Sequence, residues 1–426
     1  MKNKFKFIIL SLFIIISLTS CKISFKDETL TDTSSKESKE TSEKTSEEES
    51  IISSDITRES LIESSEEIES SSSESIDGEF TITDLLFDYH DFYGYNALAL
   101  DSSGELMQDA YETYFEAASE FLVSNKDLSP KKVSGTDYYC VGSYKVNTKD
   151  DVNKVINTIT VFVQENPIFY FLSNSYAYFT TQQGSKITYE VCMNCSEDYI
   201  LQSTRQTMNE AILDMVKELD NNYDDLVIKS DYNVCKMVHD FICNRIDYDY
   251  CDVVEYLNSL NEVVVYKKTD KEGTYYVTNL EDDKGSTTYD LTNLHVGTSG
   301  QIANVHAYDH NILGIVLNKA AVCEGYAKAY LLLTRYYNIN SINVVGIAGE
   351  VGNQGGHAWN YTKIDGKWYG VDVTWDDQNI IYYTYFLASK STMESEHSPY
   401  GQSSTNPLQF NPVLPELNPL KYNGLF

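Results

Sequence analysis

The chain reads Gly356-His-Ala-Trp-Asn-Tyr-Thr-Lys-Ile364, then Asp365-Gly366, then Lys367-Trp-Tyr-Gly-Val-Asp-Val-Thr374. Apolar and polar residues alternate through the first segment, as they do in a half-buried β-strand. Asp-Gly is a strong signal for a two-residue hairpin turn. We therefore predict an antiparallel hairpin in which residues 367–374 form the returning strand.

The predicted register brings a histidine and an aspartate together. A two-residue turn at residues 365–366 pairs His357 with Thr374. By the same count Trp359 faces Asp372, so His357 and Asp372 share a face as diagonal neighbours, about 7–8 Å apart. A carboxylate placed there can orient an imidazole. A three-residue turn would separate the two, and the competing interpretation is a surface His and Asp without a shared role.

A cysteine opens the helix that precedes this hairpin. The segment Ala321-Val-Cys-Glu-Gly-Tyr-Ala327 leads into a helical pattern that we expect to end near Asn338. Helical spacing connects one stripe of residues, namely Cys323, Ala327, Tyr330, Leu331 and Thr334. Cys323 therefore lies in the first turn, where free N–H groups and the helix dipole favour a thiolate. Alone it would be read as a buried structural thiol, but with a base nearby it is a candidate nucleophile.

Three segments carry this chemistry: Val322-Cys-Glu-Gly-Tyr-Ala327, Gly356-His-Ala-Trp-Asn360 and Val371-Asp-Val-Thr-Trp-Asp-Asp377. Their residues, order and spacing resemble the motifs of the bacterial transglutaminase-like superfamily. The resemblance extends over roughly residues 230–400, because further segments are also similar to the family: Val238-His-Asp-Phe-Ile242, Ile246-Asp-Tyr-Asp249 and Tyr385-Phe-Leu-Ala-Ser389 with His397.

The resemblance implies an α+β fold with a papain-like transglutaminase core, in which the Cys-bearing helix packs on an antiparallel β-sheet that carries His and Asp. It also implies a catalytic triad in which Cys323 is the nucleophile, His357 the general acid and base, and Asp372 the residue that orients the imidazole. The long Tyr-rich stretch before Cys323 departs from the family pattern.

Other residues near these motifs have less specific signals. The backbone N–H of Cys323 is one candidate oxyanion donor, and Tyr308 or Asn311 is a possible side-chain donor. Glu324 reads as a structural or capping residue. We expect the three tryptophans to pack in the core rather than to bind substrate: Trp359, Trp368 and Trp375.

An acyl-enzyme formed on Cys323 has two fates. Attack by water makes the protein a peptidase or amidase, and attack by an amine makes it a cross-linking protein-glutamine gamma-glutamyltransferase. Hydrolysis is slightly favoured because water needs no second amine site. A non-catalytic surface-binding module is the third alternative. The expected partner is a protein or peptide substrate, with cell-wall and surface proteins among the candidates, and no metal or other cofactor is required.

Composition excludes one class of function. The chain has 426 residues and a formal net charge of −32. Nucleic-acid binding needs clustered Lys and Arg, so this balance argues against it. The acidic excess comes partly from residues 22–79, which are dominated by Ser, Glu, Thr and Lys and are predicted to be a disordered tether.

The first 21 residues read as a lipoprotein signal peptide. Lys2, Lys4 and Lys6 precede an apolar run from Ile8 to Leu18 that is too short to span a bilayer comfortably. Leu18-Thr-Ser-Cys21 resembles a bacterial lipobox, whose Cys becomes acylated. The alternative is an ordinary signal peptide that happens to hold a Cys. We expect an extracytoplasmic protein anchored to the bacterial cell membrane through lipid on Cys21.

The remaining chain is predicted to have an N-terminal α+β region (80–203) and a transglutaminase-like domain (204–426). Six cysteines other than Cys21 and Cys323 allow 15 disulfide connectivities, and the spacing of Cys192-Met-Asn-Cys195 alone is a weak metal signal. Residues 250–300 look like an insertion or a long hairpin over the core. The predicted helices are 104–124, 152–163, 204–219 and 233–244, and the predicted strands are 137–145, 168–172 and 185–193.

Overall fold

The structure is a computed structural model that describes residues 80–133, 136–257, 262–270, 273–277, 295–303, 308–318, 320–352, 354–378, 380–401 and 409–423. The predicted signal peptide, the lipobox at Cys21 and the tether at residues 22–79 lie outside these residues. Among the helices that the structure describes, none combines the length and apolarity needed to cross a membrane.

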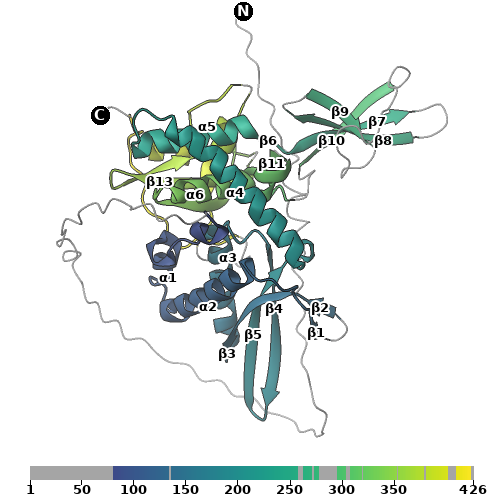
Figure 1. Ribbon diagram of the computed structural model, residues 1–426, viewed down its shortest axis with the longest axis vertical. Coiled ribbons are helices and arrows are strands. Elements are labelled where there is room, and N and C mark those ends of the chain that lie inside the picture. The colour runs from purple at the N-terminus through teal and green to yellow at the C-terminus, as the bar shows by residue number, and fades with distance from the viewer. Residues whose placement is uncertain are drawn as a thin grey trace, which may run out of the picture.

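The N-terminal region is an α+β unit. Its helices are α1 (Tyr93–Leu98), α2 (Gly104–Leu122) and α3 (Lys149–Glu165), and its three-stranded sheet has the order β3-β5-β4, with β3 (Cys140–Val146), β4 (Leu172–Gln183) and β5 (Lys186–Cys195). A small ribbon of β1 (Lys131–Val133) and β2 (Thr136–Tyr138) adjoins it (Figure 1). The predicted helices at 104–124 and 152–163 and the strand at 185–193 are confirmed, and the buried stripe of α2 includes Tyr111 and Tyr114.

One predicted strand in this region is wrong. Residues Ile168–Phe171 are buried but form turns, and the strand β4 begins only at Leu172. Periodicity cannot separate a short buried run in a turn from a buried strand. Here Pro167 lies two residues after the end of α3, and Phe169 packs flat against Phe162 of that helix, with ring centroids 5.6 Å apart.

The second region places one helix on a four-stranded sheet. The sheet has the order β14-β13-β12-β15, and α6 (Cys323–Tyr336) packs on β12 and β13. Helices α4 (Gln202–Asp224) and α5 (Asp231–Arg245) precede it, and both predicted helices here are confirmed. The strands are β12 (Ser341–Ala348), β13 (Gly355–Ile364), β14 (Lys367–Val371) and β15 (His397–Pro399). The short helices α7 (Val373–Asp376) and α8 (Lys390–Glu394) follow the hairpin.

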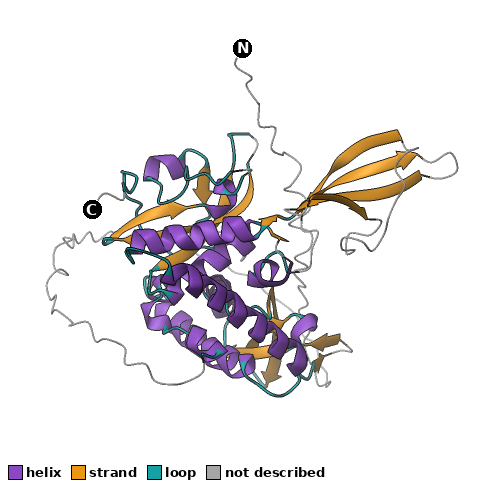
Figure 2. Cartoon of the chain, turned by 45° about the horizontal axis from the view of Figure 1, so that its top comes forward, coloured by secondary structure: helices purple, strands orange, loops and turns teal. Residues whose placement is uncertain are grey.

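The Tyr-rich insertion contains a sheet of its own. Its described strands have the antiparallel order β10-β7-β8-β9, with β7 (Tyr250–Leu257), β8 (Glu262–Asp270), β9 (Gly273–Val277) and β10 (His295–Ala303). Figures 1 and 2 show this sheet extending to one side of the core rather than lying over it. The prediction of an insertion is therefore confirmed for these strands, but the prediction that it covers the core is wrong.

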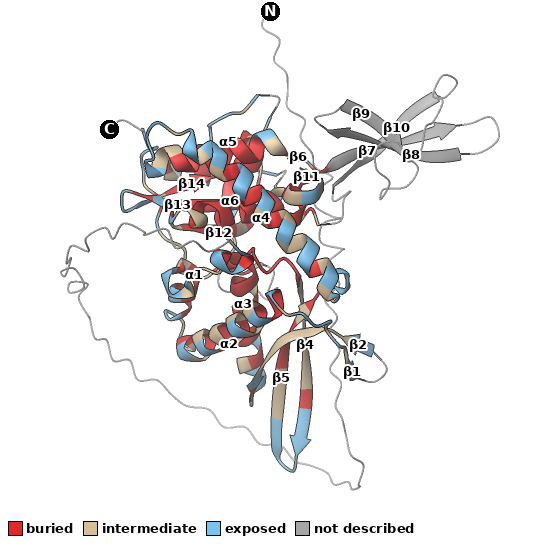
Figure 3. Cartoon of the chain, viewed as in Figure 1, coloured by how far each residue is buried: buried red, intermediate tan, exposed pale blue. Residues whose placement is uncertain are grey.

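The two regions share one continuous core. A single buried cluster joins residues of α2 and α3 to residues of α5 and α6, and Figure 3 shows α6 buried along most of its length. The Arg335 guanidinium of α6 bonds both the backbone carbonyl and the carboxylate of Glu165 at the end of α3. That carboxylate also accepts the N–H groups of Gly94 and Tyr95 at the start of α1, at 2.8 and 3.1 Å. Contacts with the N-terminal α+β region thus also hold the Cys-bearing helix in place.

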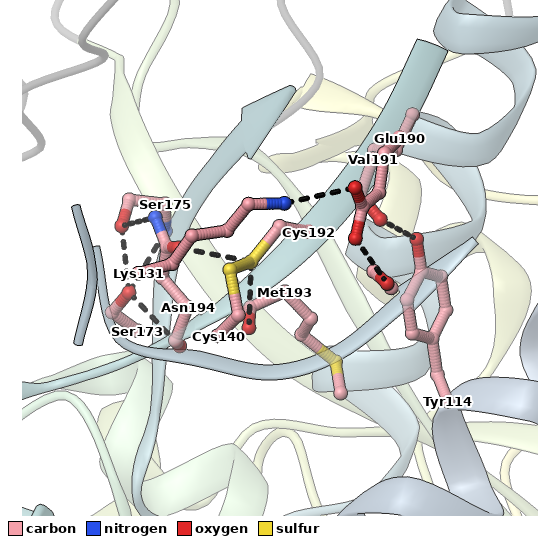
Figure 4. Close-up of a disulfide and its surroundings, with 11 residues drawn as sticks. Tyr114, Lys131, Cys140, Ser173, Ser175, Glu190, Val191, Cys192, Met193 and Asn194 are labelled. Atoms are coloured by element: carbon pink, nitrogen blue, oxygen red, sulfur yellow. Dashed lines mark hydrogen bonds and ion pairs between the residues drawn. A yellow bond between two sulfur atoms is a disulfide. The ribbon is translucent and has the colours of Figure 1, made fainter. Parts of the chain in front are cut away.

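A disulfide joins Cys140 of β3 to Cys192 of β5 (Figure 4). It closes a loop of 52 residues, which by chain entropy contributes about 4 kcal/mol. The bond removes Cys192 from any metal site with Cys195. Cys195 is buried and outside the disulfide, as are Cys235 and Cys243. The side chain of Cys251 lies outside the described residues.

Candidate active site

Backbone hydrogen bonds hold Cys323 at the start of α6. The short strand β11 (Ala320–Ala321) pairs in parallel with β6 (Asp247–Tyr248), so Ala321 lies opposite Tyr248. Val322, the N-cap of α6, is extended, and its N–H donates to the Asp309 carbonyl at 3.1 Å. Cys323 follows as the first residue of the helix and is partly exposed. It therefore combines the free N–H groups of a helix start with access from outside.

The hairpin that carries His357 has the predicted register. Ile364 pairs with Lys367, and the two turn residues both have positive φ, 50° at Asp365 and 74° at Gly366. This backbone matches the two-residue turn that Asp-Gly favours. The other edge of β13 pairs with β12, where His357 lies opposite Gly346.

The returning strand is shorter than predicted. It ends at Val371, and Asp372 is the N-cap of α7, so the predicted pairs of Trp359 with Asp372 and His357 with Thr374 are not part of the ladder. The reason is local, because aspartate is a preferred N-cap residue and Asp372 Oδ1 accepts the Trp375 N–H at 3.1 Å. The diagonal contact survives, since His357 Nε2 lies 2.7 Å from Asp372 Oδ2.

A second histidine reaches the same carboxylate oxygen. His397 Nε2 lies 2.9 Å from Asp372 Oδ2, and the side chain is buried. In the sequence, His397 stands out only as part of a segment similar to the family. Its position on β15, at the opposite edge of the sheet from β14, explains why no local pattern pointed to it.

The charges of this cluster support an ion-paired state. Burial opposes protonation of His357, but the Asp372 carboxylate, the Cys323 sulfur and hydrogen bonds to both raise the pKa of His357 to about 10. Burial alone would raise the pKa of Asp372, yet the His357 charge and hydrogen bonds from both imidazoles hold it well below its usual range. His357 thus lies between a carboxylate and a thiol, protonated at neutral pH.

Comparison with known proteins gives a family match for part of the chain. Residues 276–373 match the family model of the transglutaminase-like superfamily. The core of this chain is transglutaminase-like. The matched segment includes all three residues of the proposed triad, and the match supports a cysteine-based enzyme in general terms. A search of curated proteins found no match.

Two solved structures are similar to this chain. One is a crystal structure of a TGase, 12% identical over 69% of this chain and 68% of that chain, with a TM-score of 0.25. The other, from Cytophaga hutchinsonii, is described as a "Putative Cysteine Protease"; it is 11% identical over 58% of this chain and 70% of that chain, with a TM-score of 0.21.

The tryptophans of the transglutaminase-like core have different positions. Trp359 is fully buried, as expected of a core residue. Trp368 is partly buried and packs edge-on against Tyr93 of α1. The Trp375 ring stacks on the His357 imidazole with centroids 5.2 Å apart. Trp375 therefore helps to hold the imidazole, a role that the sequence pattern did not predict.

The side chains suggested as oxyanion donors each make another contact. Tyr308 packs against Tyr199, with ring centroids 5.7 Å apart, and Asn311 Oδ1 accepts the Leu313 N–H at 2.7 Å. Tyr248 lies closer to the chemistry, because β6 pairs with the residues that lead into Cys323. Burial raises the pKa of Tyr248 well above its usual value, and the nearby Cys323 and the carboxylates of Asp309, Asp249 and Asp372 raise it further. The hydroxyl of Tyr248 therefore stays protonated.

Glu324 has contacts of a structural residue. Its carboxylate lies 2.9 Å from His310 Nδ1 and 2.7 Å from Lys328 Nζ. Burial alone would raise the pKa of Glu324, but these two cations keep it well below its usual range. The contacts tie the first turn of α6 to the segment before it.

The three groups His357, Asp372 and His397 could also hold a metal ion, because their ligand atoms all lie within 4.8 Å of one another. Their convergence has a simpler explanation. Both imidazole Nε2 atoms lie within hydrogen-bond distance of one carboxylate oxygen. A metal would have to displace the protons on which these contacts depend.

A buried carboxyl pair lies beside the approach to Cys323 and leads to a prediction on stability. Burial and the neighbouring carboxylate of Asp249, which shares a hydrogen bond with Asp309, raise the pKa of Asp309 to about 8. The acid form of Asp309 is thus favoured by folding. Its contribution to stability is complete below the usual pKa of 3.8 and is lost as the pH rises through about 8.

Asp309→Asn keeps a neutral donor toward Asp249 and removes this dependence. We expect the melting temperature of the variant, relative to that of the wild type, to rise on the order of 3–8 °C between pH 5 and pH 9. Calorimetry at both pH values measures the difference. If the difference in melting temperature between variant and wild type is the same at pH 5 and pH 9, Asp309 does not hold its proton in the folded protein.

Proposed function

We propose that this protein is a cysteine hydrolase, a peptidase or amidase that cleaves peptide or amide bonds through a thioester on Cys323. The observation that supports it most is the position of His357, hydrogen-bonded to Asp372 on one side and to Cys323 on the other. A surface histidine without function would not be buried between a carboxylate and a thiol. The match of residues 276–373 to the transglutaminase-like superfamily supports the same chemistry.

Acylation begins with attack of the Cys323 thiolate on the carbonyl carbon. The C–S bond forms and the carbonyl electron pair moves to oxygen, where we assign the Cys323 N–H and the Tyr248 hydroxyl as hydrogen-bond donors. His357, protonated beforehand, gives its proton to the leaving nitrogen as the C–N bond breaks. The products of this half-reaction are a thioester on Cys323 and a free amine, and Asp372 keeps the imidazole in position throughout.

Deacylation repeats these steps with water. His357 removes a proton from the water molecule, whose oxygen attacks the thioester, and the Cys323 thiolate leaves beside the imidazolium. The released product is a carboxylic acid. An amine could take the place of water, and the protein would then be a cross-linking enzyme, which remains the second candidate.

The test uses a glutamine-containing reporter peptide with increasing concentrations of a small primary amine. We expect mass spectrometry to show the carboxylic acid as the main product at every amine concentration. An amide product that rises with amine and replaces the acid would favour the cross-linking alternative. Absence of any product, together with a Cys323 that iodoacetamide does not label, would favour the non-catalytic surface module.

We also propose that the protein acts outside the cytoplasm, anchored by lipid on Cys21, on peptide or protein substrates near the cell surface. The lipobox-like Leu18-Thr-Ser-Cys21 and the disulfide between Cys140 and Cys192 support this location, because disulfides persist mainly outside reducing compartments.

Cys21→Ser tests the anchor. The variant lacks the thiol to which lipid is attached, so we expect it to lose labelling by a radioactive or clickable fatty acid and to be released or to keep its uncleaved signal. Wild-type protein should partition into the detergent phase of a Triton X-114 separation. A wild-type protein that stays in the aqueous phase and takes up no label would contradict the anchor, and Cys195→Ser serves as a control for the loss of another thiol.

A further inference from the structure

The carboxylate of Asp372 has one imidazole donor more than a Cys-His-Asp triad requires. Oδ1 accepts the Trp375 N–H at 3.1 Å, and Oδ2 lies 2.7 Å from His357 Nε2 and 2.9 Å from His397 Nε2. Because Asp372 is ionised, each imidazole must present an N–H to Oδ2. The same oxygen is therefore shared between the candidate general base and a second histidine.

Packing holds His397 firmly in this position. Its backbone pairs with Ala348 in the β15–β12 ladder, and only 1% of its side chain is exposed. Three aromatic rings surround the imidazole, with centroid distances of 4.9 Å to Trp359, 4.5 Å to Trp375 and 5.3 Å to Tyr385. These rings leave little freedom for any arrangement other than the one that points Nε2 at Asp372.

The polar contacts of His397 indicate why this position holds a histidine rather than an apolar aromatic residue. Within the described part of the chain, Nδ1 of His397 is buried without a hydrogen-bond partner, so Asp372 provides its single polar contact there. Burial of an unpaired polar atom is unfavourable, and an apolar ring would fill the same aromatic surroundings without that cost. The benefit must therefore come from the N–H that His397 offers to Asp372.

We infer that His397 is a positioning residue, which fixes the carboxylate of Asp372 and shares its negative charge so that His357 can release its proton during turnover. This inference rests on the proposed function. Two effects follow when the second N–H is lost. The carboxylate becomes freer to rotate, and it binds the His357 imidazolium more tightly, because it no longer divides its charge between two donors.

Other ionisable groups also act on this cluster. They are Cys323 on α6, Tyr248 on β6, Asp376 on α7, and Tyr385 with its hydrogen-bond partner Glu396 before β15. All of them are kept in the experiment, so a change in pH dependence can be assigned to position 397.

The experiment compares His397→Phe, which keeps the ring but has no N–H, with His397→Gln, whose amide can donate from nearly the same place. We expect His397→Phe to lower kcat about 10–100-fold with KM within about threefold of the wild type, because a group acting through another residue has a smaller effect than the triad itself. His397→Gln should restore kcat to within a few-fold. His90→Phe removes a histidine that is largely exposed and should change nothing.

The second readout does not depend on the substrate. The rate of alkylation of Cys323 by iodoacetamide is measured as a function of pH. Its profile gives the pH at which the thiolate–imidazolium pair forms and the pH at which the imidazolium of His357 loses its proton. We expect its alkaline limb to move to higher pH in His397→Phe and to return in His397→Gln.

Three outcomes would overturn the positioning role: a normal kcat in His397→Phe, an alkaline limb that does not move, or equal damage in both variants accompanied by a lower melting temperature. If wild-type protein shows normal alkylation but no turnover of peptides or amides, the proposed function fails while the role of His397 is still decided by the alkylation profile.

Discussion

Cys323→Ala is expected to abolish turnover, with a fall in kcat/KM of at least about 10⁴-fold, while the protein remains folded. The substitution removes the sulfur that forms the thioester, and no other group can take its place. The structural cost should be small, because Cys323 is partly exposed at the first position of α6. The contacts that hold this helix start are made by the backbone of its neighbours. Peptide or amide turnover and the melting temperature are the two measurements.

Cys235→Ala is the matched control for the loss of a thiol. Cys235 lies on α5 and is fully buried, so its replacement should lower stability by about 1–2 kcal/mol and leave kcat/KM unchanged. If Cys323→Ala keeps most of its activity, the nucleophile is another group and the proposed mechanism is wrong. If both variants lose activity and stability together, the loss reflects folding rather than chemistry.

Asp372→Asn is expected to lower kcat on the order of 10⁴-fold, by analogy with other triads in which the carboxylate sets the imidazole tautomer. The structure gives a specific reason. Asp372 accepts hydrogen bonds at both oxygens, one from the Trp375 N–H and the other from two imidazoles. An asparagine has a single acceptor oxygen, so its NH₂ must face either the helix cap or His357 and His397.

An extra residue in the hairpin turn should cause similar damage for a different reason. Insertion after Gly366 shifts the whole of β14 by one position relative to β13, which moves Asp372 away from His357 unless a bulge absorbs the extra residue. We expect turnover to fall by a similar factor, while circular dichroism shows that most of the fold is kept.

Asp365→Asn is the control for the turn. Asn-Gly favours the same two-residue turn as Asp-Gly, and Asp365 is exposed, so this variant should have normal kinetics. Kinetically normal Asp372→Asn would show that the carboxylate does not orient His357. Normal activity in the insertion variant, without a bulge in its structure, would show that the register is not what brings the two residues together.

Local sequence determined the parts of the candidate site that depend on near neighbours. Asp365-Gly366 specifies the turn, the alternation after Gly356 specifies the face, and together they bring His357 to Asp372 at the end of one hairpin. The helix that begins at Cys323 follows from its own periodicity. These features need no distant partner, because turn geometry and side-chain period act over a few residues.

Other features depended on segments that are far apart in the chain. The third donor to Asp372 comes from β15, and the hydrogen-bond partner of Arg335 on α6 is Glu165 at the end of α3. The disulfide was one of 15 possibilities. The turn at Ile168–Phe171 resembled a strand because its residues are all apolar. They are apolar because they are buried, and not because they follow the period of a strand. The sequence by itself therefore determined the hairpin, the helix start and the chemistry that their residues allow. Only the tertiary structure decided which distant side chains surround Asp372, because such contacts form when whole elements pack and leave no spacing in the sequence to read.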